Sequence, residues 1–430
     1  MASDESFPFI KGTALRSEKY SAVPRRMEAE FVLPPRNAGE HAKFIRDRVA
    51  LLSETVRIDS PKKITASDRK IISVRMTTAA GVDPELLEST KKGAQISLLD
   101  FDPQTGIALV DARPELRPLL QKLDRYEKSL KDKPETPSNR KLINYIEDIR
   151  LAGFSEVVGD ALRADWATLP KDMPIWLEFH VRGGYSNKIE ASASKAALQA
   201  AFRKQQLQSD LEKLRLQMPE EDVYFALISI NAAAEVFALV DCIFELELPP
   251  QVALKWLQAE HRPTTVDPQL KFDSLSPTAP EVVLLDSGLL GEHPLLKPVI
   301  SGVHSALENE TGADSFGHGT EMAGVAVYGQ QLPDVLQHGR YAPEARIRSV
   351  QLIKAPGQGT ALEEMRAAWP ALTEKAVAIA DAGAVNVKQV FALAITAESK
   401  FGDRASSWTN AVDKAAYNHC LLYTSDAADE

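Results

Sequence analysis

The chain is poor in cysteine and in long apolar runs, and it has no excess of positive charge. Its 430 residues include 2 cysteines, and 50 Lys and Arg against 60 Asp and Glu give a formal charge of −10. This balance offers no basic field for nucleic acid. No stretch reaches the roughly 18 apolar residues of a transmembrane helix, and Met1–Ser6 lacks the apolar core of a signal peptide. We therefore expect a cytoplasmic protein that binds neither nucleic acid nor membranes.

Residues 420–430 resemble the translation of a common transposase sequencing adapter, and His419 stands where the first base of that adapter would complete a codon. The alternative is a genuine acidic tail that matches the adapter codon by codon. We expect an adapter-like artefact outside the fold. Removing Asp426, Asp429 and Glu430 changes the formal charge from −10 to −7 and leaves Cys242 as the remaining cysteine, so we expect no internal disulfide.

Proline-rich segments divide the chain, which exceeds what one hydrophobic core usually holds even without residues 420–430. Lys131–Pro137 is a short charged linker, and a longer one contains Pro263, Pro268, Pro277 and Pro280. We expect an irregular segment and a helix over residues 1–60, α+β units over 61–135 and 136–262, a linker over 263–280, and a further domain over 281–419.

Strand and helix patterns alternate in both N-terminal units. Ala42, Ile45, Val49 and Leu52 recur at helical spacing, Ile72–Met76 alternates like a half-buried strand, and we expect a helix from about Pro84. In the second unit, Ile175–Val181 predicts a strand with His180 on its outer face, where we interpret it as a surface histidine. A long helix with a stripe of Leu207, Leu211 and Leu214 is expected next. This order favours ferredoxin-like α+β units.

From Glu281 onward, apolar runs at 282–285, 347–353 and 390–395 alternate with helical stretches from about Leu362 and Trp408. This pattern predicts an α/β domain, with a parallel sheet flanked by helices. Asp286 follows the first run, so its carboxylate should lie at the carboxyl end of a parallel strand. An Asp in this position is more often a loop or cap residue. A histidine flanked by glycines, such as His318, is likewise weak evidence for a catalytic site when taken alone.

The combination of motifs is more specific. Asp286-Ser287-Gly288 is followed 32 positions after Asp286 by His318 within Gly317-His318-Gly319-Thr320, and then by Tyr341–Ile347, which is similar to a Val-Ala-Pro-x-Ala segment. The chain resembles the subtilisin-like serine peptidase family (family S8), in which Asp, His and Ser follow in this order. Glu321-Met322 departs from the commoner His-Val but lies outside the catalytic atoms.

The resemblance implies a role for each of these residues. His318 would be the general base and Asp286 would hold its tautomer. Gly357 and Gly359 would lie in the loop beside the substrate groove, and Ala394 and Ile395 in the strand that hydrogen-bonds an extended peptide. The family's oxyanion Asn and Gly-Thr-Ser serine have no counterpart in this sequence, since Ser425 lacks the glycine and lies in the adapter-like tail. We expect them beyond residue 419, so that the present chain is a C-terminally truncated endopeptidase, inactive without them.

The resemblance also concerns partners and cofactors. Phe7–Gly12, Leu33–Arg36 and Asn139–Ile143 look similar to a cytoplasmic bacterial subgroup with long N-terminal regions, sometimes encoded beside an ATPase. Protein or peptide substrates and an ATPase partner are therefore expected. No cofactor is required; structural calcium is frequent in the family but cannot be assigned, and the histidines at 293, 304, 318 and 338 lack metal-ligand spacing. One α+β unit is hypothesised to restrain the peptidase, and the alternative function is a pseudoprotease that serves as a regulated binding module.

Overall fold

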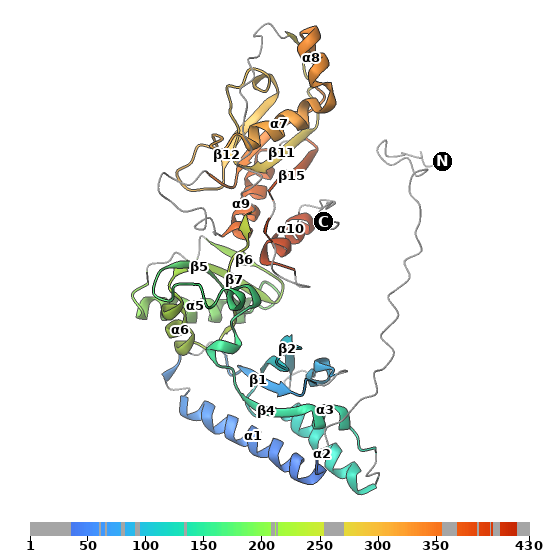
Figure 1. Ribbon diagram of the computed structural model, residues 1–430, viewed down its shortest axis with the longest axis vertical. Helices are drawn as coiled ribbons and strands as arrows, with labels where there is room; N and C mark the ends of the chain where they lie inside the picture. The colour runs from blue at the N-terminus through green and yellow to red at the C-terminus, as the bar shows by residue number, and fades with distance from the viewer. Residues whose placement is uncertain are drawn as a thin grey trace, which may run out of the picture.

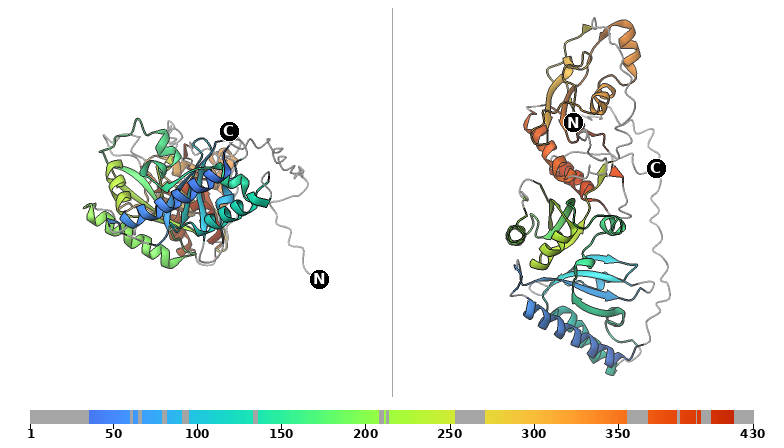
Figure 2. Two further views of the ribbon diagram at one scale, coloured as in Figure 1. Left: turned by 90° about the horizontal axis from the view of Figure 1, so that it is seen from below. Right: turned by 60° about the vertical axis from the view of Figure 1, so that its left-hand side comes forward.

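The architecture is that of a computed structural model. It describes residues 36–59, 62–64, 67–78, 82–90, 95–132, 136–207, 211, 214–252, 271–354, 368–384, 387–395, 397–398 and 405–418. Within these residues, three four-stranded sheets follow one another along the long axis of an elongated molecule, with helices between and outside them (Figure 1, Figure 2). None of the described helices combines the length and the apolar character needed to cross a membrane.

The first unit is an antiparallel sheet in the order β2-β3-β1-β4, covered on one face by helices. The apolar stripe expected in the first helix is buried there. The strands are β1 (Lys70–Met76), β2 (Ile96–Asp102), β3 (Ile107–Ala112) and β4 (Ile146–Leu151), and the helices are α1 (Ala38–Asp59), α2 (Arg117–Asp132) and α3 (Arg140–Tyr145).

Two expectations for this unit need correction. The helix expected from about Pro84 is only the 3-10 turn η2 (Pro84–Leu87), and the helical cover comes from α1, α2 and α3. Strand β4 follows the boundary expected after residue 135, yet it pairs with β1, with Val74 opposite Ile149. The expected boundary therefore separates β4 from the sheet that it completes.

The second unit repeats an antiparallel sheet, in the order β6-β7-β5-β8. Its strands are β5 (Ile175–Arg182), β6 (Arg215–Gln217), β7 (Glu221–Ile228) and β8 (Ile243–Glu247), with helices α4 (Asp160–Ala164), α5 (Lys188–Lys204) and α6 (Ile230–Leu239) and the 3-10 turn η3 (Phe154–Glu156). The prediction of a leucine stripe on the long helix was wrong. Helix α5 ends at Lys204, before those leucines, and buries Ala197, Leu198 and Phe202 instead.

His180 is not a surface residue: it is 8% exposed, because the outer face of its sheet is covered as well. That face packs on the C-terminal region. Leu216, Val223 and Phe225 of the sheet form one apolar cluster with Ala368, Ala371 and Ala411.

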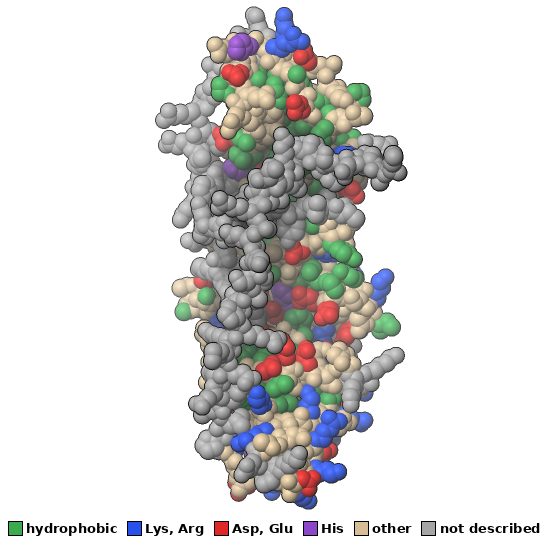
Figure 3. Space-filling model, turned by 90° about the vertical axis from the view of Figure 1, so that its right-hand side faces the viewer, with side chains coloured by type: hydrophobic (Ala, Val, Ile, Leu, Met, Phe, Trp, Pro, Cys, Tyr) green, Lys and Arg blue, Asp and Glu red, His purple; other side chains and the backbone are tan. Residues whose placement is uncertain are grey.

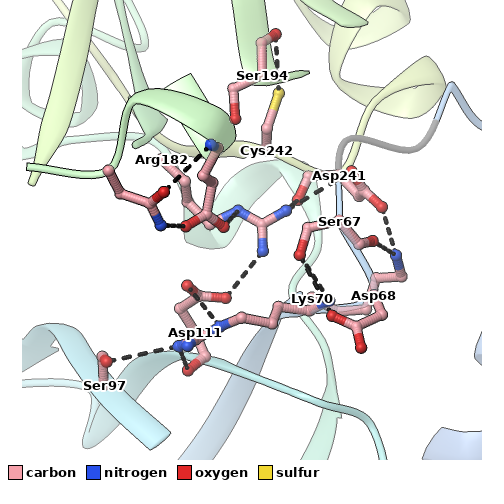
Figure 4. A network of polar contacts seen from close by, with 12 residues as sticks. Ser67, Asp68, Lys70, Ser97, Asp111, Arg182, Ser194, Asp241 and Cys242 are labelled. Atoms are coloured by element: carbon pink, nitrogen blue, oxygen red, sulfur yellow. Dashed lines mark hydrogen bonds and ion pairs between the residues drawn. The ribbon is translucent and has the colours of Figure 1, made fainter. Parts of the chain in front are cut away.

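A buried polar network joins the first two units, as Figure 4 shows. Arg182 on β5 donates to Asp111 Oδ1 on β3 at 2.9 Å and to the carbonyl oxygen of Asp241 at 2.8 Å. Lys70 on β1 pairs with the Asp241 carboxylate. On the face drawn in Figure 3, acidic side chains gather over the middle of the molecule, and Lys and Arg side chains toward the end that holds the first unit.

The third region is a parallel sheet in the order β12-β14-β11-β15, as the apolar runs predicted. The strands are β11 (Glu281–Asp286), β12 (Ile300–Ser305), β14 (Arg346–Gln351) and β15 (Gln389–Leu393). One face packs on α9 (Trp369–Ala382) and α10 (Ser407–Asn418), and the other on α7 (His318–Tyr328), which is followed by α8 (Leu332–His338). The α/β character of this domain is therefore confirmed.

Two short strand pairs lie outside the large sheets. Strand β10 (Lys271–Phe272) runs parallel to β13 (Arg340–Tyr341). Strand β9 (Gln251–Val252), which follows the second unit, pairs antiparallel with β16 (Ala397–Glu398), which follows β15. The second pair connects the second unit to the carboxyl edge of the parallel sheet.

Candidate functional site

Asp286 is the last residue of β11 and is completely buried. Its Oδ1 accepts a hydrogen bond of 2.5 Å from the backbone N–H of Ser287. Burial raises the pKa of Asp286, although hydrogen bonds from His318 and Ser287 act in the opposite direction. A carboxylate held in this way can orient a neighbouring donor without rotating freely.

His318 is the first residue of α7, and its ring faces Asp286. Nδ1 lies 2.9 Å from Asp286 Oδ1 and 3.0 Å from Oδ2. Because the carboxylate accepts, Nδ1 carries the hydrogen in the neutral ring, which leaves the lone pair on Nε2. Nε2 has no hydrogen-bond partner among the residues that the structure describes. The histidine is therefore set up to take a proton at Nε2.

Two glycines let the two motifs approach each other. A Cβ on Gly319 would lie 2.1 Å from the carbonyl oxygen of Gly288, a distance that no side chain allows. Gly288 itself has φ of +113°, which L residues rarely adopt. The glycines of Asp-Ser-Gly and Gly-His-Gly-Thr are thus needed for backbone contact between β11 and α7.

Asp314 is a functional candidate that the sequence analysis missed. Its Oδ1 accepts from Ser287 Oγ at 2.8 Å and from the backbone N–H groups of Phe316 and Gly317, and its Oδ2 accepts from the N–H and hydroxyl of Thr320. Burial opposes ionisation of Asp314, but these donors outweigh it and lower its pKa. The Asp-x-x-Gly spacing before His318 is the signal that could have found it.

Gln351, at the end of β14, is a second missed residue. Its Nε2 donates to the carbonyl oxygens of Ser287 at 3.1 Å and Ala313 at 3.0 Å. Both acceptors adjoin residues of the site, so the neighbouring strand holds the two loops together.

The remaining predicted residues fall into two groups. Gly357 and Gly359 lie outside the described residues. Ala394 and Ile395 directly follow β15, whose last registered pair with β11 is Leu393 opposite Leu285, so they reach the same edge of the sheet as Asp286. Ile395 is buried in the core beside α9.

The arrangement is a histidine base held by a buried carboxylate, which can activate a hydroxyl or water placed at Nε2. In the part of the chain that the structure describes, no group of three or more His, Cys, Asp or Glu side chains is arranged to hold a metal ion.

Comparison with models of known protein families matches residues 278–425 to the subtilase family. The match contains Asp286 and His318 and begins inside the linker expected over 263–280. A search of curated proteins finds no match.

Proposed function

Residues 278–425 of this chain belong to the subtilase family, and from this we infer that the chain carries the acid–base part of a serine-type endopeptidase. The contact between His318 Nδ1 and Asp286, at 2.9 and 3.0 Å, is the observation that supports this proposal most directly. The substrates are proteins or peptides, and the reaction requires no cofactor.

In the proposed mechanism, His318 Nε2 removes the proton from a serine hydroxyl and later delivers it to the leaving amine. Asp286 keeps the hydrogen on Nδ1 and stabilises the imidazolium that forms. The nucleophile and the oxyanion Asn are proposed to follow residue 419, because no Gly-Thr-Ser motif occurs after His318 in the sequence.

Loss of the serine and of an oxyanion donor removes most peptidase chemistry. In subtilisin itself, removal of one such donor raises the activation free energy by about 2.7–4 kcal/mol, and removal of the serine costs still more. The 430-residue chain should therefore leave a labelled casein intact. Hydrolysis by the purified chain that disappears in His318→Ala would contradict this expectation.

The decisive experiment reads the coding sequence beyond codon 419 and expresses the longer chain. We expect an Asn and a Gly-Thr-Ser motif, and casein hydrolysis that is lost in His318→Ala and in the serine variant. A reading frame that continues without Gly-Thr-Ser, with no hydrolysis, would instead support the pseudoprotease.

The second unit is proposed to be a ferredoxin-like domain that restrains the peptidase. Its β-α-β-β-α-β order and the sheet order β6-β7-β5-β8 support the fold. Docking is supported by the apolar contact of Phe225 with Ala371 and Ala411, and by the Ser407 hydroxyl at the start of α10, which donates to Glu178 at 2.7 Å. Pairing of β9 with β16 adds a strand beside the segment expected to bind peptide.

Removal of residues 1–270 from the longer enzyme tests this restraint. We expect higher peptidase activity, because the strand pair and the docked sheet are both lost. A soluble product that is less active than its parent would contradict the proposal.

A further inference from the structure

Asp314 lies between the two elements that carry the catalytic pair. It belongs to the loop before α7, and its two oxygens together accept five hydrogen bonds from Ser287, Phe316, Gly317 and Thr320. None of its partners is Asp286 or His318, so any effect on the pair passes through neighbours.

The first connection runs through Ser287. The Ser287 hydroxyl donates to Asp314 at 2.8 Å and accepts from the N–H of Gly319 at 3.0 Å. The backbone N–H of Ser287 donates to Asp286 Oδ1. Ser287 thus fixes the position of the peptide group that orients the Asp286 carboxylate.

The second connection runs through the first turn of α7. Gly317, at the N-cap, has no side chain to satisfy the free N–H groups of that turn, and Asp314 accepts from Thr320 N–H at 2.8 Å in its place. The lowered pKa of Asp314 agrees with an ionised acceptor at the positive end of the helix. His318 is the first residue of this turn, so the cap holds the backbone from which its ring extends toward Asp286.

We propose that Asp314 is a positioning residue that holds Asp286 and His318 in register, through Ser287 on one side and through the first turn of α7 on the other. The proposal rests on the proposed function, because it concerns the same pair. It goes beyond that function in assigning a third and a fourth side chain, those of Asp314 and Ser287, to the geometry of the Asp286–His318 pair.

The test observes the tautomer of His318 directly, in the 430-residue chain and without an activity assay. Histidine-selective ¹⁵N labelling and long-range ¹H–¹⁵N spectra, recorded above the ordinary histidine pKa, show which ring nitrogen carries the hydrogen. His318→Ala assigns the signal. The variants are Asp314→Ala, Asp314→Asn and Ser287→Ala, and Asp334→Asn is the matched control, since Asp334 is an exposed acid in the first turn of α8.

The parent chain and the control should show a single Nδ1–H tautomer. Asp314→Ala and Ser287→Ala should each give a mixture of tautomers, because Asp286 and the ring lose their alignment. Asp314→Asn, which keeps one acceptor oxygen, should give a smaller shift toward the mixture, and it serves as the test if the Ala variant does not fold.

Other outcomes overturn the proposal in distinguishable ways. A parent chain without the Nδ1–H tautomer would refute the Asp286–His318 pair itself, and with it the proposed function. A pure Nδ1–H tautomer in Ser287→Ala, together with a mixture in the Asp314 variants, would refute the connection through Ser287. Asp314 would then act only as the cap of α7. Unchanged spectra in all folded variants would refute positioning while leaving the catalytic pair intact.

Discussion

Substitution of His180 by Gln should destabilise the second unit at acidic and neutral pH, with a smaller effect at alkaline pH. His180 Nδ1 lies 3.1 Å from Glu221 Oε2, and its Nε2 lies 3.3 Å from Glu178 Oε2. Both ring nitrogens can donate to carboxylates only when the ring is protonated. The variant therefore leaves two acids without their cation.

The exposed fractions of the side chains determine the size of the effect. Glu178 is 2% exposed, His180 10% and Glu221 22%. Removing one partner of a buried pair costs about 3–5 kcal/mol. Since Glu221 is partly hydrated and Gln still donates one hydrogen bond, we expect about 2–3 kcal/mol.

The pH dependence follows from the shifted pKa values. Burial opposes protonation of His180, but Glu221 and Glu178 outweigh it and raise its pKa well above 6.5. A raised pKa gives stability that is fully present below the unfolded value and lost as the pH rises through the folded value. Burial also raises the pKa of Glu245, on the adjacent strand, to about 7. Its ionisation adds an acid beside the cation, so the difference should persist through neutral pH.

Urea unfolding at several pH values, combined with hydrogen exchange of the β5 amides, measures this difference within the second unit. The matched control is His338→Gln, an exposed histidine on α8, which should change little at any pH. A loss of stability in His180→Gln that is the same at acidic and alkaline pH would show that no protonated ring lies between these carboxylates.

Three further substitutions test the packing of the chain and the burial of the Asp286 carboxylate. Gly319→Ala should cost about 1–3 kcal/mol in thermal unfolding, because its Cβ would meet a carbonyl of the Asp-Ser-Gly turn, whereas Gly324→Ala on the same helix has open space and should cost nothing. Phe225→Ala, at 0% exposed, should lose about 3–5 kcal/mol in urea, and Leu227→Ala, at 53%, little; equal losses would refute the docking surface. Asp286→Asn should be at least as stable as the parent at neutral pH, since burial raises the Asp286 pKa and makes its ionised form costly; a clear drop in melting temperature would contradict this.

The sequence was most informative where a structural requirement determines several residues close together in the chain. Asp286 and His318 were paired from sequence through the resemblance of their two motifs to a known family, and the structure adds a physical reason for the motif glycines, which allow the close backbone approach at Gly288 and Gly319. The parallel strands were predictable because burial on both faces produces continuous apolar runs. These features depend on short stretches of chain.

Features that depend on distant segments were missed. The alternation around His180 showed that two faces differ, but not that helices much later in the chain cover the outer one. Asp314 and Gln351 look like ordinary loop and strand residues until the fold brings Ser287 to them. The partner of β4 could not be predicted either, since strand pairing across a linker leaves no local pattern.

The docked face of the second unit has a consequence for biosynthesis. The ribosome adds Phe225 long before Ala411, which packs in the same cluster. Translation of the residues between them takes on the order of 10–40 seconds. During that interval the outer face of the sheet, with Val223 and Phe225, is exposed to solvent and can bind other apolar surfaces. Recruitment of a ribosome-associated chaperone to this face would protect the chain until α9 and α10 emerge.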